Sequence, residues 1–179
     1  MPKDGLLPQQ RRLAALVGEW EGESRTWFSP GDAPRESRWT TRRRPIMGGR
    51  FVLEEYSSSL DGDPFEGIVL YGWDLAEKKH FAVWVDTFHM SSGPMHSTGA
   101  EVPSALLNVI GTYKAGEQVW GWRTVIEVAS PGEQVVTAYN ISPAGQEDKA
   151  IETRLRRRKA AARGSRPARR APPRRKARR

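Results

Sequence analysis

The chain has 179 residues, a formal net charge of +8 and no cysteine. This length fits one domain with an appendage better than two domains, and the lack of cysteine excludes disulfides, thiolate metal sites and cysteine nucleophiles. The N-terminus MPKDGLLPQQRR has no signal-peptide stretch, and the longest apolar run, 81–85, is too short to span a membrane; we therefore expect a cytoplasmic protein.

The charge is divided unevenly along the chain. From Arg154 onward there are 14 Lys or Arg residues and no Asp or Glu, which leaves 15 basic and 21 acidic residues in the first 153 positions, a net charge of −6. Residues 159–179 contain only Arg, Lys, Ala, Pro, Gly and Ser. Such a composition cannot bury enough apolar surface to offset its ordering entropy, so we expect a disordered tail.

Residues 8–17 are predicted to form a short helix. Pro8 suits a first helical turn and Gly18 suits a helix stop. Leu13 and Leu16 lie three positions apart and give the helix one apolar stripe. A helix this short is unstable alone, so we expect it to pack against the rest of the domain.

Beyond Gly18 the sequence reads as short strands separated by turns. The first segment alternates, with Trp20 and every second residue after it on one face and Glu19, Glu21 and Glu23 on the other. About ten strands are predicted, at 19–28, 36–46, 50–60, 65–75, 80–88, 96–102, 105–114, 118–130, 134–142 and 149–158.

This spacing predicts an all-β domain, either a sandwich or a barrel. Hairpin-length turns favour an antiparallel up-and-down barrel of lipocalin-like type, because closure removes exposed sheet edges; a flat sandwich is the alternative. The predicted organisation is an N-terminal segment and helix over 1–18, a barrel domain over 19–158 and a disordered basic tail over 159–179. The sequence does not indicate an oligomeric state.

Several motifs also resemble a known family. LAALVGEWEGE resembles the L-x-G-x-W-x-G opening of lipocalin-like bacterial domains, and GGRFVLEEY, PFEG, GWD and WVDT are similar to one such family that is known only as a domain of unknown function. The resemblance covers about residues 13–130, and it implies a barrel related distantly to fatty-acid-binding proteins and nitrobindins. It implies no activity, since a fold does not specify one.

The haem-binding nitrobindins share the opening pattern, but the present sequence lacks the histidine that is expected to ligate haem in that group. That group is expected to ligate haem through a histidine late in the chain, whereas the histidines here are His80, His89 and His96. Glu23 also stands where a further glycine would be usual. We therefore expect no cofactor.

A hydrophobic pocket is indicated by seven tryptophans in so short a chain. Trp20, Trp84 and Trp122 lie on strand faces that we expect to point inward, so they are candidate ligand-binding residues; core packing is the alternative role. We place Arg123 on the solvent-facing side of the strand that carries Trp122.

Asp86 is a carboxylate in the apolar strand FAVWVDTF, on the face that carries Trp84. A buried carboxylate needs a partner or shifts its pKa, which makes it a functional candidate. His89 could be a general base oriented by Asp86, with Tyr56 supplying a hydroxyl. Exposed loop positions for His89 and His96 are the alternative, and no recognised metal-ligand spacing joins them to Asp86.

Glu54 and Glu55 are consecutive strand residues and must point to opposite faces, so they cannot act as an acid/base pair. We expect one of them to face inward or to pair with an arginine of 42–44. The serines at 57–59 lack any nucleophile motif.

Three functions remain open. The first is a non-enzymatic barrel that binds a small hydrophobic ligand. The second is an acid/base enzyme that acts on a small apolar substrate through Asp86, His89 and Tyr56. The third is a scaffold whose tail, which has no aromatic residue for base stacking, associates nonspecifically with nucleic acid.

Overall fold

A computed structural model gives the fold, and it describes residues 5–90 and 93–158. A helix, α1 (Pro8–Leu13), leads through a 3-10 turn (Ala14–Leu16) into ten strands. The strands are β1 (Gly18–Thr26), β2 (Arg35–Ile46), β3 (Phe51–Leu60), β4 (Asp63–Asp74), β5 (Lys79–Asp86), β6 (Met95–Gly99), β7 (Leu107–Ala115), β8 (Gln118–Ser130), β9 (Glu133–Ile141) and β10 (Glu147–Arg157).

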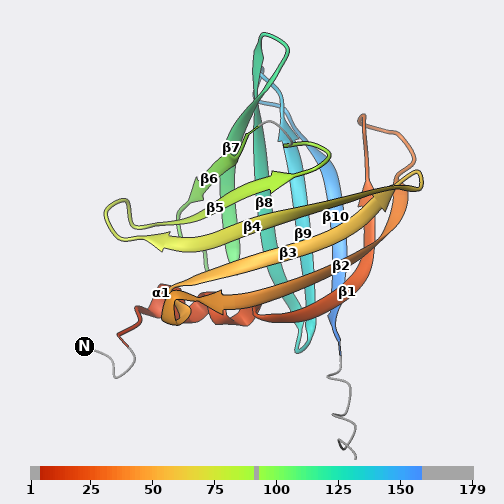
Figure 1. The fold of residues 1–179 in the computed structure, drawn as a ribbon. Helices are drawn as coiled ribbons and strands as arrows, with labels where there is room; N and C mark the ends of the chain where they lie inside the picture. The colour runs from red at the N-terminus through yellow and green to blue at the C-terminus, as the bar shows by residue number, and fades with distance from the viewer. Residues whose placement is uncertain (1–4, 91–92, 159–179) are drawn as a thin grey trace, which may run out of the picture.

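The strands form one closed antiparallel barrel (Figure 1). Each strand pairs with its neighbours in sequence, and β1 closes the ring against β10, with Trp20 opposite Arg157 and Thr26 opposite Ile151. The prediction of an all-β, up-and-down, ten-stranded barrel with a short N-terminal helix is confirmed, and the flat sandwich is ruled out.

The N-terminal helix is shorter than the sequence indicates. The α-helix stops at Leu13, and the apolar residues up to Leu16 continue as a 3-10 turn before Val17 becomes extended. Leu13 and Leu16 are both fully buried, in the same cluster as Val52 and Leu107. The predicted apolar stripe therefore packs into the core, and the tighter 3-10 turn places Leu16 in the end of the barrel.

The alternation of side chains decides what the barrel encloses. On β5 the residues His80, Ala82 and Asp86 are buried and face inward, and on β3 the same is true of Val52 and Glu54. Because side chains alternate between the two faces of a strand, every second side chain of each strand points into the barrel interior.

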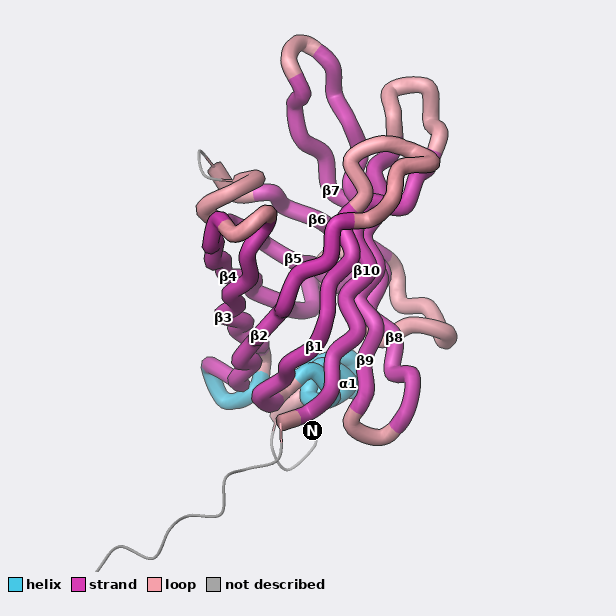
Figure 2. The backbone as a smooth tube through the Cα atoms, turned by 90° about the vertical axis from the view of Figure 1, so that its right-hand side faces the viewer, coloured by secondary structure: helices cyan, strands magenta, loops and turns pink. Residues whose placement is uncertain are grey.

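The two ends of the barrel differ. Because the strands run up and down, one end holds the connections 47–50, 75–78, 100–106 and 131–132, and α1 lies across that end (Figures 1 and 2). The other end holds 27–34, 61–62, 87–90, 93–94, 116–117 and 142–146, and none of these described residues forms a helix. We call these the closed end and the mouth. Within residues 5–90 and 93–158, no helix is long and apolar enough to cross a bilayer.

Candidate functional site

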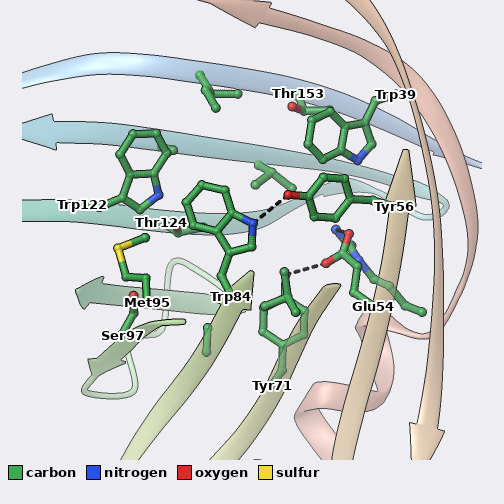
Figure 3. Close-up of a pocket in the computed structure, with 16 residues that line it drawn as sticks. Trp39, Glu54, Tyr56, Tyr71, Trp84, Met95, Ser97, Trp122, Thr124 and Thr153 are labelled. Atoms are coloured by element: carbon green, nitrogen blue, oxygen red, sulfur yellow. Dashed lines mark hydrogen bonds and ion pairs between the residues drawn. The ribbon is translucent and has the colours of Figure 1, made fainter. Parts of the chain in front are cut away.

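The barrel interior contains a cavity of about 100 Å³, which we call the inner cavity. Most of its wall is apolar or aromatic, and Figure 3 shows Trp39, Tyr56, Trp84 and Trp122 arranged around it. The complete lining is Trp39, Arg43, Glu54, Tyr56, Val69, Tyr71, Ala82, Trp84, Met95, Ser97, Trp122, Thr124, Val136, Ala138, Ile151 and Thr153. For comparison, an apolar cavity of about 150 Å³ accepts benzene.

A second cavity, of about 310 Å³, lies at the mouth and is called the mouth pocket. Trp27, Phe28, His89 and Tyr113 are among the residues around it. Four residues line both cavities: Trp84, Met95, Trp122 and Ile151. The inner cavity and the mouth pocket thus share these side chains as a common wall, and the stacked rings of Trp84 and Trp122, with centroids 5.8 Å apart, form part of that boundary.

A hydrogen-bonded network lies beside this boundary. The hydroxyl of Tyr56 accepts a hydrogen bond from Trp84 Nε1 at 2.7 Å and donates to Asp86 Oδ2 at 3.2 Å. The same Asp86 oxygen lies 3.1 Å from His89 Nδ1. Tyr56, Trp84, Asp86 and His89 thus form one network, which the sequence predicted as ligand-binding candidates without showing that they touch.

A glycine makes this network possible. Gly67 on β4 is paired with Tyr56 on one side and Asp86 on the other. A Cβ atom at Gly67 would lie 2.4 Å from the Tyr56 hydroxyl and 2.7 Å from Asp86 Cβ. Only a residue without a side chain lets the Tyr56 ring reach across β4 to the next strand.

The geometry of Asp86 fixes its charge and orients His89. Asp86 is only 6% exposed, and its Oδ1 accepts the backbone N–H groups of His89 and Met90, both at 2.6 Å. Desolvation works against ionisation, but hydrogen bonds from the His89 side chain and from these backbone groups outweigh it and lower the pKa of Asp86.

His89 lies between the network and solvent. With Nδ1 as the donor to Asp86, Nε2 is the acceptor nitrogen of the neutral ring. The side chain is 32% exposed and lines the mouth pocket, and its ring packs edge-on against Phe88 with centroids 4.3 Å apart. A partly exposed imidazole held by a buried carboxylate is the arrangement expected of a general base.

A separate polar cluster lines the inner cavity and was not predicted as a functional site. Glu54 accepts from Arg43 Nη2 at 3.0 Å, from Thr41 at 2.8 Å and from Tyr71 at 2.5 Å. Arg43 Nη1 donates to Gln134 at 2.6 Å, and the Gln134 amide donates to the Ala15 carbonyl at the closed end. The expectation that one of Glu54 and Glu55 faces inward or pairs with an arginine of 42–44 is confirmed.

The cluster is buried and electrically neutral overall. The Arg43 and Glu54 side chains are 2% and 4% exposed. Burial lowers the pKa of Arg43, but the adjacent Glu54 carboxylate outweighs this and leaves it raised, so the guanidinium stays protonated. Burial and the nearby Glu54 raise the pKa of Tyr71, which therefore remains a neutral donor.

Other candidates lie elsewhere. Trp20 faces inward but at the closed end, where Nε1 donates to the Leu16 carbonyl and the Arg157 guanidinium covers the ring; it lines neither cavity. His96 is on the outer face, stacked on Phe81. No group of three possible metal-ligating His, Cys, Asp or Glu residues is found in the described ranges.

Two further sequence predictions have different outcomes. Arg123 faces outward, as predicted, and there it pairs with Glu147. The basic segment 159–179 lies outside the described residues, so its disorder and its association with nucleic acid stay predictions.

Comparisons with known proteins agree with the fold. The crystal structure of Rv2717c from M. tuberculosis is similar, with a TM-score of 0.57 and 14% sequence identity over 86% of this chain and 99% of that chain; at this identity the likeness shows the fold alone. No curated protein matches the chain. A family described as a protein of unknown function, DUF1579, matches residues 7–157. The match spans most of the sequence, and the chain therefore belongs to the DUF1579 family.

Proposed function

We propose that this protein binds a small, mainly apolar ligand, which enters at the mouth and occupies the inner cavity. The observation that carries the proposal is a closed barrel whose interior is hollow and lined largely by aromatic and aliphatic side chains. Protein interiors are normally close-packed, so an aromatic-lined cavity with a few convergent polar groups is the usual form of a ligand site.

The arrangement of the wall indicates the size of the ligand. At about 100 Å³ the inner cavity is smaller than the cavity of about 150 Å³ that accepts benzene, so it holds one ring at most, and a substituent on that ring would reach the boundary at Trp84 and Trp122. A longer guest would extend past Trp84 and Trp122 into the mouth pocket, where His89 and Tyr113 would contact it. The binding residues in this proposal are Tyr56, Trp84, Asp86, His89 and Trp122, with Asp86 acting by holding Tyr56 and His89.

Titration with isopropylbenzene, an uncharged one-ring probe, tests this function. We expect saturable quenching of tryptophan fluorescence, because Trp84 and Trp122 line the cavity, with a Kd of roughly 1 mM or below, equivalent to at least about 4 kcal/mol. Ala138→Leu adds three carbon atoms to the cavity wall and should abolish this quenching.

Val125→Leu is the matched control. It also introduces a leucine, with one added carbon atom, on β8 at a position that alternates outward, between the inward-facing Thr124 and Ile126. It should leave the titration unchanged. Quenching that survives Ala138→Leu, or an absence of any saturable binding by the wild-type protein, would overturn the proposal.

A second candidate function is proton transfer, and the Asp86–His89 contact specifically favours it. A carboxylate that accepts from Nδ1 holds the imidazole with Nε2 directed away from it, as a general base requires. The base would remove a proton from an apolar substrate held between the mouth pocket and the inner cavity. Tyr56 already accepts from Trp84 and donates to Asp86, so it positions the network.

5-Nitrobenzisoxazole is a suitable probe for this second function. Its C3 proton would pass to His89 Nε2, the C3–H electron pair would form the nitrile, and the N–O bond would break to give a phenolate. We expect turnover above the buffer rate in the wild-type protein and a loss of about 100-fold in His89→Gln. An unchanged rate in His89→Gln would exclude this function, and isopropylbenzene binding would be unaffected by that result.

A further inference from the structure

The polar cluster at Arg43 has a donor without a partner, and this bears on the ligand. Of the three guanidinium nitrogens, Nη1 is used by Gln134 and Nη2 by Glu54. Nε is buried and has no hydrogen-bond partner in the described part of the chain. Arg43 also lines the inner cavity.

A buried N–H without an acceptor is costly, since the group has lost its hydration and gained nothing in return. Most buried polar groups in proteins are therefore paired, and an exception needs a physical reason. No described residue supplies an acceptor to Nε, and Glu54 is already engaged by Arg43 Nη2, Thr41 and Tyr71. The acceptor must come from what occupies the cavity.

We propose that the ligand carries an uncharged oxygen acceptor, such as a ketone, aldehyde or ester carbonyl, at the end that enters first, and that this oxygen accepts from Arg43 Nε. The inference deepens the proposed binding function and depends on it. The ligand would have an apolar body against Trp84 and Trp122 and a single acceptor at the inner end.

The charge of the cluster argues for an uncharged acceptor over a carboxylate. Arg43 and Glu54 form a buried pair with no net charge, and the Glu54 oxygens lie in the same cavity wall. A carboxylate guest would lose its hydration and meet the Glu54 carboxylate, with one N–H group to offset both effects. A carbonyl oxygen needs only one donor and carries no charge to desolvate.

A set of probes of similar size tests this. Isopropylbenzene, acetophenone and benzoate each have nine heavy atoms, and they end in an apolar group, a carbonyl and a carboxylate. We expect acetophenone to bind the wild-type protein about fivefold to tenfold more tightly than isopropylbenzene, as one net hydrogen bond predicts. Benzoate should bind more weakly than acetophenone.

Arg43→Lys is the informative variant, because it keeps a cation for Glu54 but has no Nε–H group. The preference for acetophenone over isopropylbenzene should disappear, while isopropylbenzene binding remains. Should this variant fail to fold, the Nε–H resonance of Arg43 in the wild-type protein gives an independent measurement. It should shift on adding acetophenone and not on adding isopropylbenzene.

The outcomes separate the two proposals. If isopropylbenzene and acetophenone bind equally and the Nε–H resonance does not move, water is the acceptor at Arg43 and this inference is wrong, although the binding function stands. Tightest binding by benzoate would also overturn it, in favour of an anionic ligand. If none of the three probes binds, the proposed function itself fails.

Discussion

Removing one partner of the buried Arg43–Glu54 pair should destabilise the barrel strongly. In Glu54→Gln the Arg43 guanidinium, whose side chain is 2% exposed, loses its counter-charge and stays buried. Breaking a buried pair in this way costs about 3–5 kcal/mol. For a domain of this size, each 1 kcal/mol lowers Tm by about 2–4 °C, so Tm should fall by roughly 6–20 °C.

The double variant Arg43→Met with Glu54→Gln separates charge burial from packing. It removes both charges, and the amide that replaces the Glu54 carboxylate still offers an oxygen to Thr41 and Tyr71, which donate to Glu54 in the wild-type protein. We expect it to be more stable than Glu54→Gln alone, with a coupling free energy of at least about 1 kcal/mol.

Urea unfolding followed by tryptophan fluorescence and by circular dichroism measures these free energies and checks that the transition is two-state. Arg44→Met with Glu55→Gln is the matched control, because that pair lies 3.5 Å apart on the outer face with both side chains about half exposed. Its coupling should be below about 1 kcal/mol. Equal coupling in the two pairs would refute the argument from burial.

Three further perturbations test other parts of the molecule. Asp86→Asn should lower stability at pH 6, and the loss should shrink progressively as the pH falls below about 4. Because the folded-state pKa of Asp86 is lowered, its contribution is full above the unfolded pKa and is lost as the pH falls through the folded one. A loss in urea titrations that stays constant from pH 6 down to the acid limit of folding would contradict this. Gly67→Ala should cost about 1–3 kcal/mol and displace Tyr56, whereas Gly93→Ala, where a Cβ meets nothing within 4 Å, should be neutral; thermal unfolding compares the two. Truncation after Arg158 should remove any salt-sensitive affinity for a DNA duplex measured by anisotropy, and affinity unchanged by truncation would exclude the tail as the binding segment.

The sequence predicts most of the fold because alternation and turns are local properties. Both faces of β5 are apolar, so only the structure shows that Asp86 points inward, but period-two spacing does put Trp84 and Asp86 on one face of this strand. The same reasoning places Arg123 outside, where it pairs with Glu147.

The polar cluster could not be predicted in the same way. The run Arg42, Arg43, Arg44 has no alternation of its own, so it does not show which arginine faces inward. The pairing of Arg43 with Glu54 depends in addition on the register between β2 and β3. A signal did exist in the preceding alternation, since Trp39 and Thr41 share a strand face with Arg43.

The network around Asp86 also depends on information that strand spacing does not contain. Tyr56 and Asp86 belong to strands separated by β4, and their contact requires the register that sets Gly67 between them. His89 lies beyond the end of β5, and it turns back toward Asp86 because three backbone N–H groups donate to one carboxylate oxygen. Strand spacing does not describe this turn, so the sequence alone did not decide whether His89 is an exposed loop residue or a general base beside Asp86.

The most direct test of ligand binding inside the barrel is an NMR measurement with methyl-labelled protein and acetophenone in excess. Intermolecular NOEs should connect the probe's aromatic protons to the methyl groups of Val69, Ala82 and Ala138, which line the inner cavity. NOEs confined to outer-face methyls such as those of Ile110, or no NOE at saturating probe, would contradict the account.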